Sequence, residues 1–292
     1  MRTYLDCIPC FIRQALEAAR LTTNDADLQT EIVRQALLLA SEQDFEQPPP
    51  VMGQALHRLI RRLAGDTDPY REAKQRFNQA ALTLYPELKR RVTCSPHPFE
   101  TALRLSIAGN IIDLGVNADL KVSHMEAAVQ QALKATLEED QVAQLAERVQ
   151  SAESICFVAD NAGEIVFDRL LVEELPTERT TVVVRGAPVL NDATLEDARA
   201  VGLTEVVRVI DNGSDAPGTL LGDCCEEVRR LLARCDLVIA KGQGNYETLS
   251  QLGERVFLLL RVKCPVIAGE IGCPVGSLVV CQGREPAETG GA

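Results

Sequence analysis

The chain lacks the features that place a protein in a membrane or on the secretory route. No run reaches the roughly 18 uninterrupted apolar residues that a membrane-spanning helix needs. The first residues, Met1-Arg2-Thr3-Tyr4-Leu5-Asp6-Cys7, contain no apolar signal segment. We therefore expect a cytoplasmic protein that makes no membrane contact.

An excess of positive charge is also missing. The chain has 30 Lys and Arg residues against 42 Asp and Glu residues, which gives a net charge of -12. Nucleic-acid binding depends on clustered Lys and Arg side chains that neutralise phosphates, so we expect no nucleic-acid partner. A small anionic ligand stays compatible with this charge if a bound metal, a lysine or a helix N-terminus supplies local positive charge.

Several sequence motifs for cofactors and nucleophiles are absent. No Gly-x-Gly-x-x-Gly follows the first strand of the predicted sheet, which weakens NAD or FAD binding. The Walker A pattern and the Gly-x-Ser-x-Gly nucleophile elbow are missing as well. The chain has few histidines, and all lie outside the polar cluster described below, so we expect packing or surface roles for His57, His97 and His124.

The 10 cysteines do not indicate a disulfide framework, because a large cytoplasmic chain does not need one. Cys156 lies in a predicted strand and is most simply a small buried apolar residue. Cys7-Ile8-Pro9-Cys10 is a CxxC pattern, which can bind zinc, perform thiol redox chemistry or simply pack. Cys264 and Cys273 are the candidates for further zinc ligands, although their spacing is not that of a second CxxC.

What is present is typical of a soluble globular enzyme, with 292 residues, 46% hydrophobic and 25% charged. The N-terminal part carries apolar residues at helical spacing. The predicted helices cover residues 10–21, 28–41, 51–64 and 70–85. A further apolar helix from residue 98 ends near Asn110 and Asp113, which are three residues apart and share a helix face. These two residues either cap and end that helix or line a site. An amphipathic stretch over residues 124–150 follows.

After Ser151 the pattern changes to short apolar runs that alternate with helices, at residues 155–159, 181–184, 206–210, 237–240, 256–260 and 278–280. This alternation predicts an α/β fold: a Rossmann-like, mostly parallel sheet flanked by helices, with an N-terminal all-helical subdomain. We expect a helical subdomain over 1–92, a helical connection that contributes to the active site over 93–150, the metal- and phosphate-binding domain over 151–285 and a flexible tail over 286–292.

Polar residues follow four of the predicted strands. They are Asp160-Asn161-Ala162-Gly163-Glu164, Asn191-Asp192, Asp211-Asn212-Gly213 and Lys241-Gly242-Gln243-Gly244-Asn245. The carboxyl ends of parallel strands meet at one edge of a sheet, where ligands bind. We therefore expect these segments to converge on one site.

Two parts of this cluster indicate specific chemistry. Asp160, Asn161 and Asp192 are a plausible partial shell for a hard divalent cation such as Mg²⁺, with Asn191 and Asp211 as competitors for the third position. Lys241, flanked by Gly242 and Gly244, resembles a phosphate cradle. Taken singly, an Asp-Asn pair is more often a turn or a helix cap, and Lys-Gly-x-Gly is more often an ordinary loop.

The ordered combination of motifs resembles the damage-control phosphatases, also known as the domain of unknown function 89 family, in its stand-alone archaeal and bacterial branch. The motifs that carry the resemblance are Asp6-Cys7-x-Pro9-Cys10, Ala108-Gly109-Asn110-x-x-Asp113, Asp160-Asn161-Ala162-Gly163-Glu164 and Lys241-Gly242-x-Gly244-Asn245. The match spans nearly the whole chain.

The resemblance implies a metal-dependent phosphoric monoester hydrolase that acts on small phosphorylated metabolites, either sugar phosphates or damaged phosphometabolites, with Mg, Mn, Co or Ni as cofactor. It implies Asp160, Asn161 and Asp192 as metal ligands, and Asp160, Glu164 and Lys241 as catalytic residues. The substrate pocket would contain Asn110, Asp113, Gly242, Gly244 and Asn245.

Three points stay open from the sequence. The nucleophile is either a water, positioned or deprotonated by Glu164, or the Asp160 carboxylate. The alternatives to a phosphatase are a methyltransferase that uses S-adenosylmethionine and a non-catalytic metabolite-binding protein. The sequence indicates neither the particular substrate nor the oligomeric state.

Overall fold

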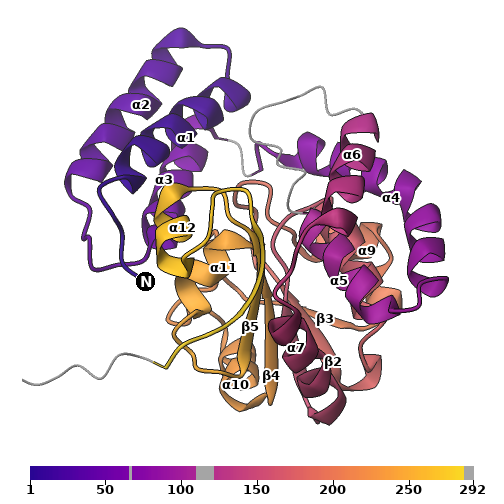
Figure 1. Cartoon of the computed structure of the whole chain (residues 1–292). Helices are drawn as coiled ribbons and strands as arrows, with labels where there is room; N and C mark the ends of the chain where they lie inside the picture. Colours follow the sequence, from indigo (N-terminus) through magenta and orange to yellow (C-terminus); the bar gives the residue numbers. More distant parts are fainter. Residues whose placement is uncertain (66–67, 110–121, 286–292) are drawn as a thin grey trace, which may run out of the picture.

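The computed structural model describes residues 1–65, 68–109 and 122–285 (Figure 1). Its centre is one six-stranded sheet in the order β3-β2-β1-β4-β5-β6. The strands are β1 Ile155–Val158, β2 Thr180–Val184, β3 Arg208–Asp211, β4 Leu237–Lys241, β5 Val256–Arg261 and β6 Leu278–Gln282. All neighbours pair in parallel except β5 and β6, which are antiparallel. The predicted α/β fold with a mostly parallel sheet is confirmed.

The strand order reverses direction between β1 and β4, which are neighbours although β2 and β3 separate them in the chain. In open α/β sheets the connections on the two sides of such a point leave in opposite directions. They leave a crevice at the carboxyl ends of the strands, which is where ligands bind. The predicted site segments after β1 and β4 therefore lie on both sides of the point where the strand order reverses.

The strands form here because their residues are apolar on both faces of the sheet. In β1, Ile155 and Phe157 join one hydrophobic core, whereas Cys156 and Val158 join the other. This alternation follows from the strand geometry, in which successive side chains point to opposite faces. The prediction that Cys156 is a buried apolar residue is confirmed.

Two helical layers cover the sheet (Figure 1). The core on the face of Phe157 contains residues of α4 Arg71–Thr93, α5 Pro98–Gly109, α6 Val122–Lys134, α7 Glu139–Ser151, α8 Glu164–Val172 and α9 Leu195–Ala200. The opposite core contains residues of α10 Glu226–Arg234, α11 Gly242–Leu249 and α12 Pro265–Ile271. Short 3-10 helices, η1 Thr177–Arg179 and η2 Leu203–Glu205, precede β2 and β3.

The first three helices form a unit with a small core of its own. They are α1 Cys7–Thr22, α2 Ala26–Ser41 and α3 Pro49–Ala64. Helix α3 contacts α11, so this unit lies beside the sheet near the end of β4. The predicted subdomain boundary at residue 92 places α4 with the N-terminal helices. In the structure, however, Ala81 and Val92 of α4 pack in the main core with the sheet. That division stays a prediction, and the expected tail over 286–292 lies outside the described residues.

Two helical segments differ from the predicted ones. Helix α4 continues past residue 85 and through Pro86 to Thr93. A proline inside a helix costs about 3 kcal/mol, but Leu88 and Val92 are buried beyond it, and burying two such side chains contributes about 3–6 kcal/mol. The amphipathic stretch over 124–150 is two helices, α6 and α7. None of the described helices combines the length and apolar character that crossing a membrane requires.

Candidate active site

The loop after β1 and the loop after β2 are joined through their backbones. Asn161 and Asp192 form an isolated antiparallel β-bridge. Around this bridge, Ala193 N donates to Asp160 O over 2.8 Å, and Ala162 N donates to Asn191 O over 2.8 Å. The structure therefore places Asp160, Asn161 and Asp192 together at the carboxyl edge of the sheet.

The turn that starts α8 depends on Gly163 and on a side chain from α4. Gly163 has φ 77°, in the region that glycine adopts readily, and a Cβ there would lie 3.0 Å from the Cβ of Phe77. Its N–H donates to Oδ1 of buried Asn78 over 2.7 Å, and Asn78 Nδ2 donates to Asp197 in α9 over 2.8 Å. Asn78 thus fixes the turn, and Glu164 opens the helix directly after it.

The amide of Asn161 orders the acidic side chains around it. Its Nδ2 atom donates to Oδ2 of Asp160 over 2.8 Å and to Oε2 of Glu164 over 2.9 Å. Because the nitrogen serves these two carboxylates, the amide Oδ1 is the atom left to face a cation. Two carboxylates and one amide oxygen are hard donors that suit a divalent cation such as Mg²⁺ or Mn²⁺.

Burial and mutual repulsion destabilise the ionised carboxylates of this cluster. Burial raises the pKa of Asp160 well above its usual value, and the charges of Glu164 and Asp192 raise it further, whereas Arg185 and Lys263 oppose the shift. Burial also raises the pKa of Asp192, with Arg185 opposing. Additional positive charge at this point would stabilise the ionised carboxylates, which is a second reason why the donor set suits a cation.

Arg185 is a buried residue of the site to which the sequence assigned no role. It follows β2 and is 1% exposed. Its Nε donates to Oδ2 of Asp192 over 2.6 Å, and a terminal nitrogen lies 3.7 Å from Oδ1 of Asp160. The guanidinium also donates to Thr219 and Asn245. The sequence feature that marks Arg185 is its position directly after the apolar run of β2.

Lys241, the last residue of β4, is fully buried, and protein atoms fill its donor positions. Its Nζ donates to the Ser106 carbonyl oxygen over 2.9 Å, to Oε1 of Glu164 over 2.7 Å and to Oδ1 of Asp168. Burial alone would lower the pKa of Lys241, but Asp168 and Glu164 raise it above its usual value. A direct bond from Lys241 to a phosphate would therefore require one of these contacts to be released.

The glycines after Lys241 allow two close approaches at the start of α11. Gly242 has φ 78°, and a Cβ there would lie 1.9 Å from Oδ2 of Asp160. A Cβ on Gly244 would lie 2.3 Å from the carbonyl oxygen of Pro217. Gly242 thus makes room for the Asp160 carboxylate, and Gly244 makes room for the loop before α10.

Asn245 is fully buried and links three segments of the site. Its Nδ2 donates to Lys241 O over 2.7 Å and to Ala159 O over 3.2 Å. Its Oδ1 accepts from Thr219 Oγ1 over 2.8 Å. The side chain therefore ties the ends of β1 and β4 to the loop at Thr219. The contact of Asn245 with substrate stays a prediction.

The other predicted residues fall at different places. Asn110 and Asp113 lie outside the described residues. The preceding residue, Gly109, is in close contact with α8, because a Cβ on Gly109 would lie 3.1 Å from Cγ of Glu164. Asp211 ends the edge strand β3, and its Oδ1 accepts from Gly213 N over 3.0 Å. Asp192, rather than its competitor Asp211, is thus the carboxylate that the fold brings beside Asn161.

The cysteine pattern is separate from this cluster. Cys7 is partly buried, which raises the pKa of its thiol, and Cys10 is exposed and accepts from Arg13 over 3.2 Å. Among the residues that the structure describes, no three His, Cys, Asp or Glu side chains gather as a metal-ligand group. The candidate set after β1 and β2 has two carboxylates, Asp160 and Asp192, and takes its third oxygen from the Asn161 amide.

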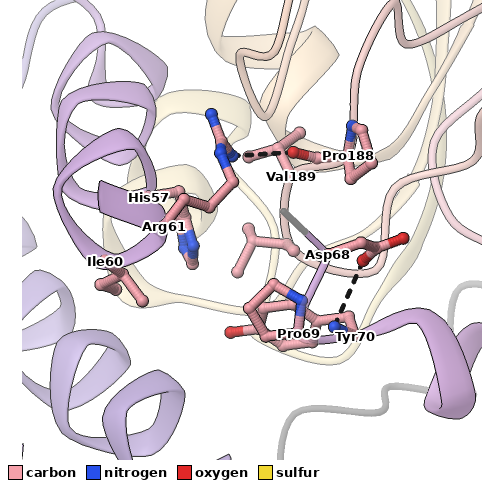
Figure 2. A pocket seen from close by; sticks show the side chains of 9 residues that line it. His57, Ile60, Arg61, Asp68, Pro69, Tyr70, Pro188 and Val189 are labelled. Atoms are coloured by element: carbon pink, nitrogen blue, oxygen red, sulfur yellow. Dashed lines mark hydrogen bonds between the residues drawn. The ribbon is translucent and has the colours of Figure 1, made fainter. Parts of the chain in front are cut away.

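Figure 2 shows a small hollow beside the loop that leads to Asp192. It lies between α3, the start of α4 and the loop, and Arg61 donates to Pro188 O over 2.8 Å across it. Leu190 in this loop has φ 47°, an uncommon conformation for a residue with a side chain. Helix α3 thus supports the loop that carries a candidate metal ligand.

The hollow also contains one of the predicted packing histidines. His57 is buried against the Tyr70 ring, and burial lowers its pKa to about 3. The packing role of His57 is confirmed, and His97 is exposed, as predicted. The side chain of His124 lies outside the described residues.

The fold and the site together define a class: a Rossmann-like α/β protein with an acidic, oxygen-rich site at the point where the strand order reverses. The comparison with known proteins gives the family within this class. The chain belongs to the damage-control phosphatase family, because residues 3–279 match the Damage-control phosphatase ARMT1-like domain.

Relatives of similar length support this assignment. A damage-control phosphatase of Pyrococcus horikoshii is 32% identical over 97% of this chain and 99% of its own length. A damage-control phosphatase of Archaeoglobus fulgidus is 35% identical over 94% of this chain and 96% of its own length. The crystal structure of a domain of unknown function 89 protein from P. horikoshii superposes with a TM-score of 0.88 at 30% identity, covering 97% of this chain and all of that one. The predicted family is confirmed.

Proposed function

We propose that the protein is a metal-dependent phosphatase that hydrolyses small phosphorylated metabolites, either sugar phosphates or damaged phosphometabolites. The observation that carries the proposal is the backbone bridge between Asn161 and Asp192, which gathers an acidic donor set at the carboxyl ends of the strands, beside the point where the strand order reverses. Membership of the damage-control phosphatase family supports the reaction class.

In this proposal Asp160, Asn161 and Asp192 hold a divalent cation, with Mg, Mn, Co and Ni as the candidates. Such a cation would supply positive charge to a phosphoryl oxygen and make phosphorus easier to attack. Arg185 keeps Asp192 oriented through its 2.6 Å bond and lowers the cost of burying two carboxylates. Gly242 leaves the space that the Asp160 carboxylate occupies.

Glu164 positions or deprotonates the attacking water. Both of its oxygens are held, Oε1 by Lys241 and Oε2 by Asn161, so the carboxylate has a fixed orientation next to the cation ligands. A general base needs this kind of placement within hydrogen-bonding reach of its proton. Direct attack by Asp160 is the other route: it forms a phosphoaspartate, expels the alcohol, and leaves water to hydrolyse the phosphoaspartate. Rapid quenching of a reaction with ³²P-labelled substrate distinguishes the two routes, because only attack by Asp160 leaves labelled phosphate bound to the protein.

The substrate contacts of the proposal come from Asn110, Asp113, Gly242, Gly244 and Asn245. Lys241 contributes positive charge near the phosphate, either through Glu164 or by releasing one of its protein partners. No particular metabolite follows from these residues, since each of them also occurs in ordinary hydrogen-bonded loops.

The test is phosphate release from a panel of sugar phosphates by chelator-treated protein, with each metal restored in turn. We expect release only with metal, and a loss of at least about 100-fold in Asp160→Ala, because a ligand and a negative charge are removed together. Equal activity of wild type and variant would refute the assignment. Thermal stabilisation by S-adenosylmethionine alone, or ligand binding that is indifferent to chelator, would favour the methyltransferase or the non-catalytic alternative.

A further inference from the structure

A buried ionic cluster lies beside the candidate active site, and its second carboxylate, Asp168, has no role in the function proposed above. The cluster consists of Glu164 and Asp168 in α8, Lys241 in β4 and Ser106 in α5, and none of them is more than 1% exposed. Asp168 accepts from Lys241 and, over 2.6 Å, from Ser106 Oγ. Protein donors hold its Oδ1 atom, and the Lys241 ammonium lies between it and Glu164.

We propose that Asp168 is a positioning residue for catalysis, which acts through Lys241 on Glu164. This inference rests on the proposed phosphatase function. Glu164 and Asp168 are four residues apart in α8, so they share a helix face, and the Lys241 ammonium lies between their carboxylates. The contacts form one chain, from Asp168 through Lys241 and Glu164 to Asn161 and Asp160.

The geometry explains why Lys241 needs a second carboxylate. An ammonium on a flexible stem has three donors and can rotate among acceptors. The Ser106 carbonyl and Asp168 fix two of these donors, which leaves the third directed at Oε1 of Glu164. Without the charge of Asp168, the ammonium would be held on one side only, and the Glu164 carboxylate would lose its fixed orientation.

The charge balance argues against a purely structural origin of the cluster. Two carboxylates share one ammonium in a fully buried place, and Asp168 Oδ2 has no hydrogen-bond partner among the described residues. Buried ionic groups of this kind are often no more stabilising than apolar residues of the same volume. Burial raises the pKa of Asp168 to about 7, against the opposing effect of Lys241, so the ionised side chain costs stability at this place.

The main experiment compares Asp168→Asn with Ser106→Ala in the metal-loaded enzyme. Asp168→Asn keeps the shape of the side chain and removes its charge, whereas Ser106→Ala removes the other donor to Oδ1 and keeps the charge and the Ser106 carbonyl. We expect kcat to fall about 10- to 100-fold in Asp168→Asn, with KM and metal affinity within about threefold of wild type. Ser106→Ala should stay within about threefold in kcat, and wild-type kcat in Asp168→Asn would overturn the proposal.

A double variant tests whether Asp168 acts through Lys241. In a Lys241→Met background the further change Asp168→Asn should have no additional effect on kcat, because the connecting ammonium is gone. Losses that multiply in the double variant would show that Asp168 acts independently, which contradicts the inference.

A measurement without turnover separates this inference from the proposed function. In ¹⁵N-lysine-labelled protein the Lys241 ammonium should give a slowly exchanging NMR signal, assigned by its absence in Lys241→Met. We expect its hydrogen exchange to accelerate at least about 10-fold in Asp168→Asn and to change little in Ser106→Ala. Unchanged exchange in Asp168→Asn would refute the positioning role, whereas wild-type protein that releases no phosphate with any metal would refute the phosphatase function.

Discussion

Gly242→Ala tests the structure of the site most directly, because the added methyl group meets one candidate metal ligand. A Cβ at Gly242 would lie 1.9 Å from Oδ2 of Asp160 and 2.3 Å from its carboxyl carbon. Ordinary van der Waals contact begins at 3.4 Å, so the carboxylate must move by about 1.5 Å. A misplacement of about 1 Å in an active site can cost about 100-fold in activity, and we expect a loss of that size in kcat/KM.

Gly65→Ala is the matched control for backbone strain. Gly65 has φ 71°, close to the 78° of Gly242, but a Cβ there meets no atom within 4 Å. The left-handed conformation imposed on alanine should cost both variants about 1–2 kcal/mol of unfolding free energy. Gly242→Ala should lose more than Gly65→Ala, because only its Cβ overlaps Asp160. Only Gly242→Ala should also weaken metal binding and phosphate release, measured by Mn²⁺ titration and by phosphate assay. If both variants agree within twofold in these two measurements, the assignment of Asp160 beside Gly242 is wrong.

Three further predictions concern stability, each measured by urea unfolding. Arg185→Ala should lower the unfolding free energy by about 3–5 kcal/mol, because it leaves Asp192 buried without its cation; a loss below 1 kcal/mol would contradict the role of Arg185. Asn78→Ala should cost about 1–3 kcal/mol, because the Gly163 N–H loses its acceptor, and an unchanged midpoint would argue against that bond. Burial raises the pKa of Glu247 from 4.5 to about 7, so its favourable contribution is complete below pH 4.5 and is lost as pH rises through 7. Glu247→Gln should therefore gain stability relative to wild type between pH 5 and 8, and parallel pH profiles would show that Glu247 does not titrate in this range.

The sheet was predictable from the sequence because parallel strands are buried on both faces. Each of the six apolar runs corresponds to a strand, with ends that differ by at most two residues. The antiparallel direction of β6 was not predictable, since an apolar run of this kind has no signal for direction. The end of α4 was missed because the sequence shows the proline at 86 but not the core against which Leu88 and Val92 pack.

The candidate site was predictable only where its residues follow strands. Asp160, Asn161 and Asp192 follow β1 and β2, so the rule that strand ends converge was sufficient to group them. Asn78 and Ser106 lie on helices far away in the chain, and only tertiary packing brings them to Gly163 and Asp168.

Asp168 had a weak local signal in the sequence. It is an acid inside the apolar run of α8, where every residue from Ile165 to Val172 other than Asp168 and Arg169 is apolar. A charged residue on the buried face of a helix needs a partner of opposite charge. The identity of that partner, Lys241 at the end of β4, became visible only in the fold.

The bridge between Asn161 and Asp192 has a consequence for ion selectivity. Backbone hydrogen bonds on both sides of the bridge fix the two loops relative to each other, and side-chain bonds from Arg185 and Asn161 orient the Asp192 and Asp160 carboxylates. A preorganised site does not spend binding energy on ordering its loops, which favours affinity for an ion that fits. The same rigidity penalises an ion of the wrong radius, because Mg²⁺ takes oxygen donors at about 2.1 Å and Ca²⁺ at about 2.4 Å. In the proposed metal site, discrimination between small and large divalent ions would therefore depend on the framework of these two loops as well as on the identity of the ligands.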